Sequence, residues 1–172
     1  MRTGRQATKA AIGLTAVATS LLAVAASVEG ETAATIPSCQ TAQLKAGHGF
    51  SSGAVGSLVT PLRLRNVSRG TCSLKGYPRV TLLTRHGHVI VRKVPRERGT
   101  VAHAVLLDPG RVAQAALRTS ISSRTGNSRD CPRAMAVQIA PPHRKRSLRI
   151  KITLRVCQAD ADVGPLRAAP RH

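Results

Sequence analysis

The chain has 172 residues, with 27 Lys and Arg against 7 Asp and Glu, so its formal net charge is +20. Trp is absent, and Phe50 and Tyr77 are the only aromatic residues. Recognition of single-stranded nucleic acid by stacking needs aromatic platforms, and chemistry on paired carboxylates needs clustered acids. The composition argues against both classes, and the length suits a single domain.

The first segment is typical of a secretory signal peptide. Residues 1–9 carry three basic side chains, and residues 10–26 are uncharged and mostly Ala, Leu, Val and Ile. A basic start, an apolar run and small residues at the cleavage point define such a peptide. We expect cleavage near Ala26 or Val28 and export from the cytoplasm. A transmembrane anchor is the alternative, although the run is short and weakly apolar for a span.

Four cysteines follow, and their number is even. In an oxidising compartment such a set predicts a disulfide framework, and spacing alone leaves all three pairings open. A zinc site is the less favoured alternative, because no Cys-x-x-Cys pair exists. The cysteines are Cys39, Cys72, Cys131 and Cys157.

Alternation of period two predicts β-strands in the first half of the body. Residues 62–65 alternate Leu with Arg. Residues 80–84 and 89–91 show the same period on either side of a His- and Gly-containing turn at 85–88. This pattern predicts a β-hairpin.

The second half shows the same period. Residues 101–107 alternate up to an Asp-Pro-Gly turn at 108–110, and residues 112–117 are the expected second arm of that hairpin. Residues 134–139 and 148–156 follow, and the last run is the clearest amphipathic strand. About seven short strands without a helical segment predict an all-β, immunoglobulin-like β-sandwich.

We expect four parts in the chain. Residues 1–25 form the signal peptide and residues 26–38 a short linker. The β-sandwich domain covers residues 39–166, and residues 167–172 form a tail, since Gly and Pro become frequent near the end.

A series of motifs resembles a known family. Asn66 is followed by the spacing Cys-x-Leu-x-Gly-Tyr-Pro, which ends at Pro78, and later come the Asp-Pro-Gly turn, Cys131-Pro, Pro141-Pro142 and Val156-Cys157. This order resembles a family of exported actinobacterial proteins that is known only as a domain of unknown function. The resemblance implies a small immunoglobulin-like sandwich with two sequential disulfides, Cys39–Cys72 and Cys131–Cys157. It implies no active site.

Two residues within this spacing have structural interpretations. We expect Tyr77 to pack over a disulfide, with Pro78 setting the start of a strand. Asn66-Val67-Ser68 is an N-glycosylation sequon. We nevertheless expect a turn at a strand end, where the Asn66 side chain bonds to the backbone.

The sequence lacks the motifs that are typical of enzymes. There is no Gly-x-Ser-x-Gly elbow, no dinucleotide loop and no cofactor motif. His48 and Ser51 are close in sequence in a Gly-rich loop, which does not suit a triad, and the cysteines are expected to be bonded. We therefore expect no enzyme and no cofactor. A small hydrolase using His48 or Ser51 is the least favoured alternative.

Three histidines are candidate metal ligands. His86 and His88 point to one face in an extended chain, and His103 could join them. Carboxylates that would support such ligands are scarce in this sequence. We expect exposed turn histidines and no metal site.

Positive charge is the remaining feature. Arg63 and Arg65 share one face of their strand, and the final strand carries basic residues on its outer face beyond a basic turn at 144–146. If both strands belong to one sheet, these cations form one surface, with Arg118 outside it. Solvated charge in an Arg-biased proteome is the alternative. The predicted anion-binding residues are Arg63, Arg65, Arg144, Lys145, Arg146, Arg149, Lys151 and Arg155.

The sequence therefore predicts an exported, non-enzymatic binding module of the cell envelope or extracellular space. Its expected partners are anionic wall polymers, acidic glycans or membrane headgroups. Nucleic acid would bind without specificity. The alternative is a structural or protein–protein adhesion domain with an apolar contact patch that the sequence does not locate.

Overall fold

The computed structural model describes residues 35–54, 56–122, 131–157 and 160–170. The predicted signal peptide, the expected cleavage point and most of the expected linker lie outside the described residues. No helix among the described residues is long and apolar enough to cross a membrane.

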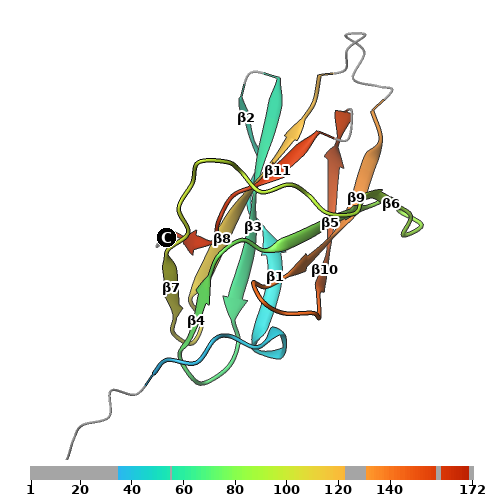
Figure 1. Cartoon of the computed structure of the whole chain (residues 1–172). Helices are drawn as coiled ribbons and strands as arrows, with labels where there is room; N and C mark the ends of the chain where they lie inside the picture. The colour runs from blue at the N-terminus through green and yellow to red at the C-terminus, as the bar shows by residue number, and fades with distance from the viewer. Residues whose placement is uncertain (1–34, 55, 123–130, 158–159, 171–172) are drawn as a thin grey trace, which may run out of the picture. The chain divides into compact units, whose positions relative to one another are not determined.

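The described residues form an all-β structure of three sheets (Figure 1). The largest, here the β3 sheet, has the order β1-β3-β8-β11, with β2 also pairing with β3 and β12 with β8. A short 3-10 helix, at Thr41–Gln43, directly precedes β1. Its strands are β1 (Leu44–His48), β2 (Ser52–Ala54), β3 (Ser57–Asn66), β8 (Val112–Ser120), β11 (Ala161–Val163) and β12 (Arg167–Ala168).

The second sheet, here the β9 sheet, has the order β10-β9-β5-β6. A separate pair joins β4 to β7. The strands of the β9 sheet are β5 (Arg79–Leu83), β6 (Val89–Val91), β9 (Arg133–Ala140) and β10 (Leu148–Arg155), and those of the pair are β4 (Cys72–Lys75) and β7 (Ala104–Leu107).

The inner faces of the sheets share one hydrophobic core. On β3, Leu62 and Leu64 are fully buried, and the residues opposite them on β8 are alanines. On the β9 sheet, register aligns Leu82, Val137 and Ile150 in one buried row. The large side chains of β3 thus stand beside small ones of β8, and the core is built from aliphatic residues of both sheets. The predicted sandwich class is confirmed.

Five strands beyond the expected seven are present, β1, β2, β4, β11 and β12, and all of them except β4 lie along the edges of the β3 sheet. β1 and β2 pair with successive parts of β3, and β11 and β12 pair with successive parts of β8. β12 lies within the segment 167–172 that we expected to be a tail. Its pairing of Arg167 with Gln114 extends the domain beyond residue 166.

One predicted hairpin is confirmed and another is wrong. β5 pairs with β6 around the turn at 85–88, where the amide of Thr84 donates to the carbonyl of His88 at 2.8 Å. The turn at Asp108–Gly110 also forms, but β7 pairs with β4 and β8 pairs with β3. The turn therefore carries the chain between sheets, because local sequence favours a turn without selecting the partner of each arm.

Both sequential disulfides are confirmed. Cys39–Cys72 joins the segment before β1 to β4, and Cys131–Cys157 joins the segment before β9 to the end of β10. All four half-cystines are buried.

Candidate anion-binding surface

The predicted cations do not form one face. Arg63 and Arg65 belong to β3, whereas Arg149, Lys151 and Arg155 belong to β10 in the other sheet. The alternation along each strand was predicted correctly. The expectation of a shared sheet is wrong, because a period of two shows which side of a strand is polar and does not show which sheet receives it.

The cations of β3 have surroundings of their own. Arg63 is half-buried, and its Cζ lies 3.1 Å from the position that a Cβ would take at Gly49. The Nε of Arg63 is buried and has no hydrogen-bond partner. Arg65 is exposed and stands directly opposite Lys45 of β1. Like charges in this position repel, so these residues make a small, separate cationic patch.

The outer face of the β9 sheet carries a different set of cations. Register places Arg149 beside Gln138 and Lys151 beside Ala136. On the other side of β9, Arg79 stands beside Ala140. The central strand therefore has small or neutral side chains at these positions, with Arg149 and Lys151 on one side and Arg79 on the other. Neighbouring strands are about 4.8 Å apart, so the flanking rows are separated by roughly 10 Å.

A cavity of ≈ 430 Å³ occupies part of this face. Arg85, Arg149 and Lys151 line it together with Met135 and nearby residues of β9 and β10. The register of β10 against β9 shifts between Lys151 and Leu154, which is a β-bulge. We name the surface made by Arg79, Arg85, Arg149 and Lys151 the β9-sheet basic face. Arg155 lies beyond the bulge and is half-buried.

The basic turn between β9 and β10 combines structural and exposed cations. Arg144 donates from Nε to the carbonyl of Cys39 at 2.9 Å and from Nη2 to the carbonyl of Ser38 at 3.0 Å. It therefore fastens the N-terminal segment and does not project freely. Lys145 and Arg146 are exposed.

A family model for a domain of unknown function, DUF4232, matches residues 39–170. The chain belongs to the DUF4232 family. The match covers every strand and both disulfides of the structure. No curated protein and no solved structure matches the chain.

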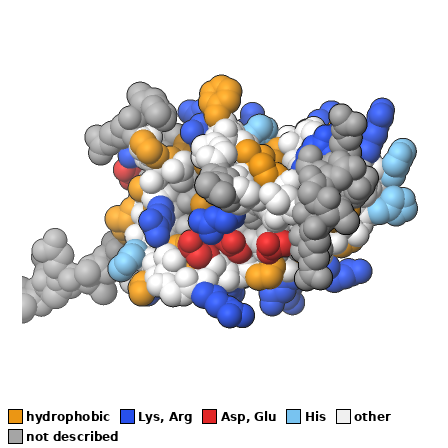
Figure 2. Space-filling model, turned by 90° about the horizontal axis from the view of Figure 1, so that it is seen from above, with side chains coloured by type: hydrophobic (Ala, Val, Ile, Leu, Met, Phe, Trp, Pro, Cys, Tyr) orange, Lys and Arg blue, Asp and Glu red, His pale blue; other side chains and the backbone are white. Residues whose placement is uncertain are grey.

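Two acidic side chains of the DUF4232 domain lie beside Arg118. Figure 2 shows acidic side chains in a row on one face, with Lys and Arg side chains around them. Arg118 pairs with Asp162 at 3.1 Å and with Glu97 at 3.6 Å. Within the described ranges, no carboxylate lies within ion-pair distance of Arg79, Arg85, Arg149 or Lys151. Arg118 is therefore unsuitable as a control position in a test of anion binding, because its replacement would also break these ion pairs.

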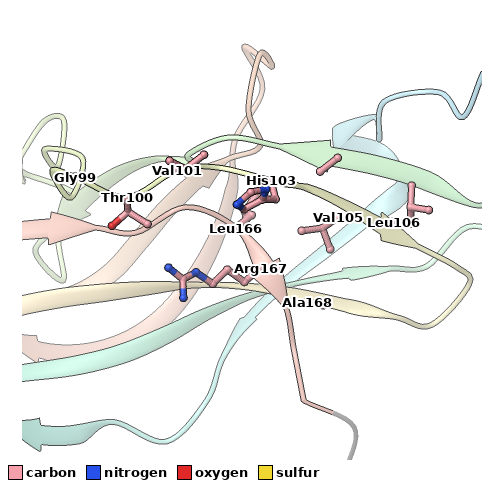
Figure 3. A pocket seen from close by; sticks show the side chains of 10 residues that line it. Gly99, Thr100, Val101, His103, Val105, Leu106, Leu166, Arg167 and Ala168 are labelled. Atoms are coloured by element: carbon pink, nitrogen blue, oxygen red, sulfur yellow. The ribbon is translucent and has the colours of Figure 1, made fainter.

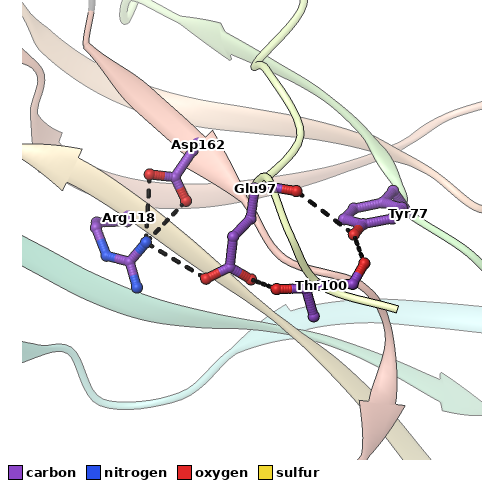
Figure 4. A network of polar contacts seen from close by, with 5 residues as sticks. All are labelled: Tyr77, Glu97, Thr100, Arg118 and Asp162. Carbon is purple, nitrogen blue, oxygen red and sulfur yellow. Dashed lines mark hydrogen bonds and ion pairs between the residues drawn. The ribbon is translucent and has the colours of Figure 1, made fainter. Parts of the chain in front are cut away.

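Tyr77 and the ion pairs together hold the segment 95–101 (Figure 4). The hydroxyl of Tyr77 donates to the carbonyl of Thr100, and the Oγ1 of Thr100 donates to Glu97 at 3.1 Å. The guanidinium of Arg96 lies 5.3 Å from the centre of the Tyr77 ring. The interactions of Tyr77 are thus with this segment, where we had expected a disulfide. The network fixes a loop that contributes to two cavities.

Asn66 has the structural role that the sequence predicted. It is fully buried, and its Nδ2 donates to the carbonyls of Gly70 and Leu107. Its Oδ1 accepts from the amide and hydroxyl of Ser68. The Nδ2 atom of the sequon is therefore buried in the folded domain and engaged in two hydrogen bonds.

The histidine and serine candidates are dispersed. His86 and His88 are exposed in the β5–β6 turn, and His103 lines a cavity elsewhere. Across the described part of the chain, no three His, Cys, Asp or Glu residues lie in a group that could hold a metal ion. Ser51 Oγ is hydrogen-bonded to Thr60 Oγ1 at 2.7 Å, and His48 Nδ1 lies 3.0 Å from the carbonyl of Gly49.

A larger cavity of ≈ 760 Å³ lies between β12 and the segment leading into β7 (Figure 3). Val101 and Leu106 line it and are 72% and 56% exposed. His103 and Arg167 are its basic side chains. β7 pairs only with β4, and β12 only with β8, among the described strands. The structure therefore has an exposed apolar area beside β12, which the sequence did not locate.

Proposed function

We propose that the protein is exported and acts as a non-enzymatic module that binds anionic polymers through the β9-sheet basic face. The observation that carries this proposal is the grouping of Arg79, Arg85, Arg149 and Lys151 on one outer face, with no carboxylate within ion-pair distance among the described residues. Such a face repels itself in the free protein, and a bound polyanion relieves that repulsion.

The shape of the face favours a polymer with repeated charges. Ala136 and Ala140 on the central strand are small and uncharged, so the cations of the flanking strands have no acidic side chain between them at these positions. Wall polymers with phosphate groups, acidic glycans and anionic membrane headgroups share this repeated charge. Binding of this kind is electrostatic, and it weakens as salt rises.

The direct test compares two double variants with equal change in charge. Arg149→Glu with Lys151→Glu alters the basic face, and Lys45→Glu with Arg65→Glu alters the exposed pair on the β3 sheet. Affinity for labelled polyphosphate and for polygalacturonate is measured over a series of salt concentrations. The affinity of the Arg149→Glu, Lys151→Glu variant should fall about tenfold or more, since each basic residue near an anionic surface contributes on the order of 1 kcal/mol.

The second variant should retain most of its affinity. Equal losses in both variants would show that net charge alone governs binding, and the face would not be a site. Circular dichroism of each variant establishes that the fold is intact, which we expect because all four side chains are exposed.

Export has an independent test. The basic start and the uncharged run of residues 10–26 support a cleaved signal peptide. Protein recovered outside the cytoplasm should begin near Ala26 or Val28 by N-terminal sequencing. Recovery of material that still starts at Met1 or Arg2 would contradict export with cleavage.

Adhesion to a protein partner is the second candidate function. The exposed Val101 and Leu106 at the cavity beside β12 favour it, because large exposed apolar side chains that share a cavity mark interaction sites. Salt separates the two candidates, since apolar contact is not weakened by added salt.

A further inference from the structure

A second cationic cavity, of ≈ 270 Å³, lies where β5 begins and β9 ends. Its walls come from three segments that are distant in sequence: residues 77–79, 93–96 and 141–145. We name it the 141–145 cavity. None of its lining residues is Asp or Glu, and the basic ones are Arg79, Lys93, Arg96, His143, Arg144 and Lys145.

Two of the guanidinium groups are held in place by backbone carbonyls. Arg79 donates from Nη2 to the carbonyl of Lys145 at 3.0 Å, and Arg144 donates to the carbonyls of Ser38 and Cys39. A carbonyl orients a guanidinium without neutralising its charge. The cavity therefore contains fixed cations before any ligand arrives, which lowers the entropic cost of binding.

Arg96 and Lys93 form the opposite wall. The Tyr77 ring lies against Arg96 by a cation–π contact, and the Tyr77 hydroxyl is bonded to Thr100. The amide of Val94 donates to the carbonyl of Val80 at 2.9 Å, which ties this wall to β5. Lys93 and Arg96 remain exposed, so their charges are available to a ligand.

The turn itself has an unusual backbone. His143 has φ 58°, in the left-handed region that residues other than glycine seldom adopt. It follows Pro141 and Pro142, and the amide of Arg144 donates to the carbonyl of Pro141 at 3.1 Å. Non-glycine residues in this region cluster at binding sites, where surrounding contacts maintain them.

We propose that the 141–145 cavity binds a phosphate monoester group, an inference that rests on the proposed function and names the end group that the polyanion site would recognise. A phosphate monoester carries nearly two charges and three terminal oxygens, which suits a cavity whose cations come from three segments of the chain. A carboxylate has two oxygens in one plane and matches a single guanidinium. The cavity volume accommodates a phosphate with a short polyol such as glycerol.

The chain supplies a specific reporter for this cavity. Tyr77 is the only tyrosine and there is no tryptophan, so the fluorescence of the folded protein reports on the cavity wall. At constant ionic strength, titration with glycerol 3-phosphate should give a saturable change in this fluorescence. Titration with glycerol or with sodium chloride should give none.

Two matched lysine pairs locate the site. Lys93→Gln with Lys145→Gln removes two charges from the cavity and keeps the backbone carbonyl that orients Arg79. This variant should bind glycerol 3-phosphate about tenfold more weakly or worse, as expected for lost charge-assisted hydrogen bonds. Lys45→Gln with Lys151→Gln removes the same charge elsewhere. It should keep the wild-type response to glycerol 3-phosphate while binding polyphosphate more weakly.

A further experiment with lipid vesicles shows whether the phosphate belongs to a lipid headgroup or to a soluble or polymer end group. Vesicles that contain phosphatidic acid present the same monoester on a membrane, whereas vesicles of phosphatidylglycerol present a diester. A response to phosphatidic acid alone assigns the site to a lipid, and a response to glycerol 3-phosphate assigns it to a soluble or polymer end. The proposal that this cavity binds a phosphate monoester would be overturned if neither ligand gave a saturable response, or if both lysine variants responded equally. If polyphosphate bound in a salt-sensitive way and no monoester gave a response, the proposed polyanion binding would be supported and monoester binding in the cavity would be rejected.

Discussion

The side-chain amide of Asn66 donates a hydrogen bond of 2.7 Å to the carbonyl of Leu107, which lies 41 residues later in the chain. Asn66 ends β3, and Leu107 ends β7 in the separate two-stranded sheet. The backbone completes the connection, because the amide of Gly110 donates to the carbonyl of Asn66 at 2.8 Å. This arrangement fixes the point where the chain crosses between sheets.

Asn66→Asp should destabilise the domain strongly. The substitution keeps the shape but replaces a donor to two carbonyls with an oxygen, so unmatched polar groups remain buried. We expect a loss of about 3 kcal/mol or more in the free energy of unfolding, measured with urea. Ser68→Ala is the control, with an expected loss of about 1 kcal/mol, since the Ser68 amide still donates. Equal stability of Asn66→Asp and the wild type would contradict the role of this residue.

Removal of the two disulfides should have different functional effects. Their sequence separations are 33 and 26, so each bridge should contribute a similar stability of about 2–5 kcal/mol. The backbone carbonyl of Cys39 also orients Arg144, and the disulfide to Cys72 holds the segment that carries this carbonyl in place. Cys39→Ala with Cys72→Ala should therefore weaken the fluorescence response to glycerol 3-phosphate. Cys131→Ala with Cys157→Ala should not, at a temperature where both variants are folded. The opposite pattern would show that Arg144 is not held through Cys39.

Tyr77→Phe should loosen the segment 95–101. The variant loses the hydrogen bond to the carbonyl of Thr100 and keeps the ring beneath Arg96. We expect a stability loss of about 1 kcal/mol and faster trypsin cleavage after Arg98. Thr100→Ser keeps both its carbonyl and its hydroxyl and serves as the control. Unchanged cleavage in Tyr77→Phe would show that other contacts hold the segment.

Leu106→Ser should separate partner binding from stability. Leu106 is 56% exposed and lines the cavity beside β12, so its replacement should change the free energy of unfolding by less than about 0.5 kcal/mol. If adhesion uses this cavity, the variant should lose salt-resistant retention on a partner surface. Phe50→Ser is the matched control, because Phe50 is fully exposed outside this cavity. Equal loss in both variants would indicate general surface stickiness.

Several features followed from local patterns. Alternation predicted the buried Leu62 and Leu64 on β3, and the sequon residue Asn66 was correctly placed at a turn that its side chain closes. These features depend on a few neighbouring residues, so a single segment contains the information. The disulfide pairing was different, since spacing left it open and the family resemblance selected it.

The sequence by itself determined seven of the strands, their polar faces, the cysteine framework and the excess of positive charge, because each is a property of short segments or of composition. Only the tertiary structure decided where the charge is concentrated. It separated Arg65 from Arg149 onto different sheets and assembled the 141–145 cavity around Arg79 and Lys93. The physical reason is that pairing between strands depends on long-range packing of the core, and a period of two specifies the side of a strand without specifying its neighbour.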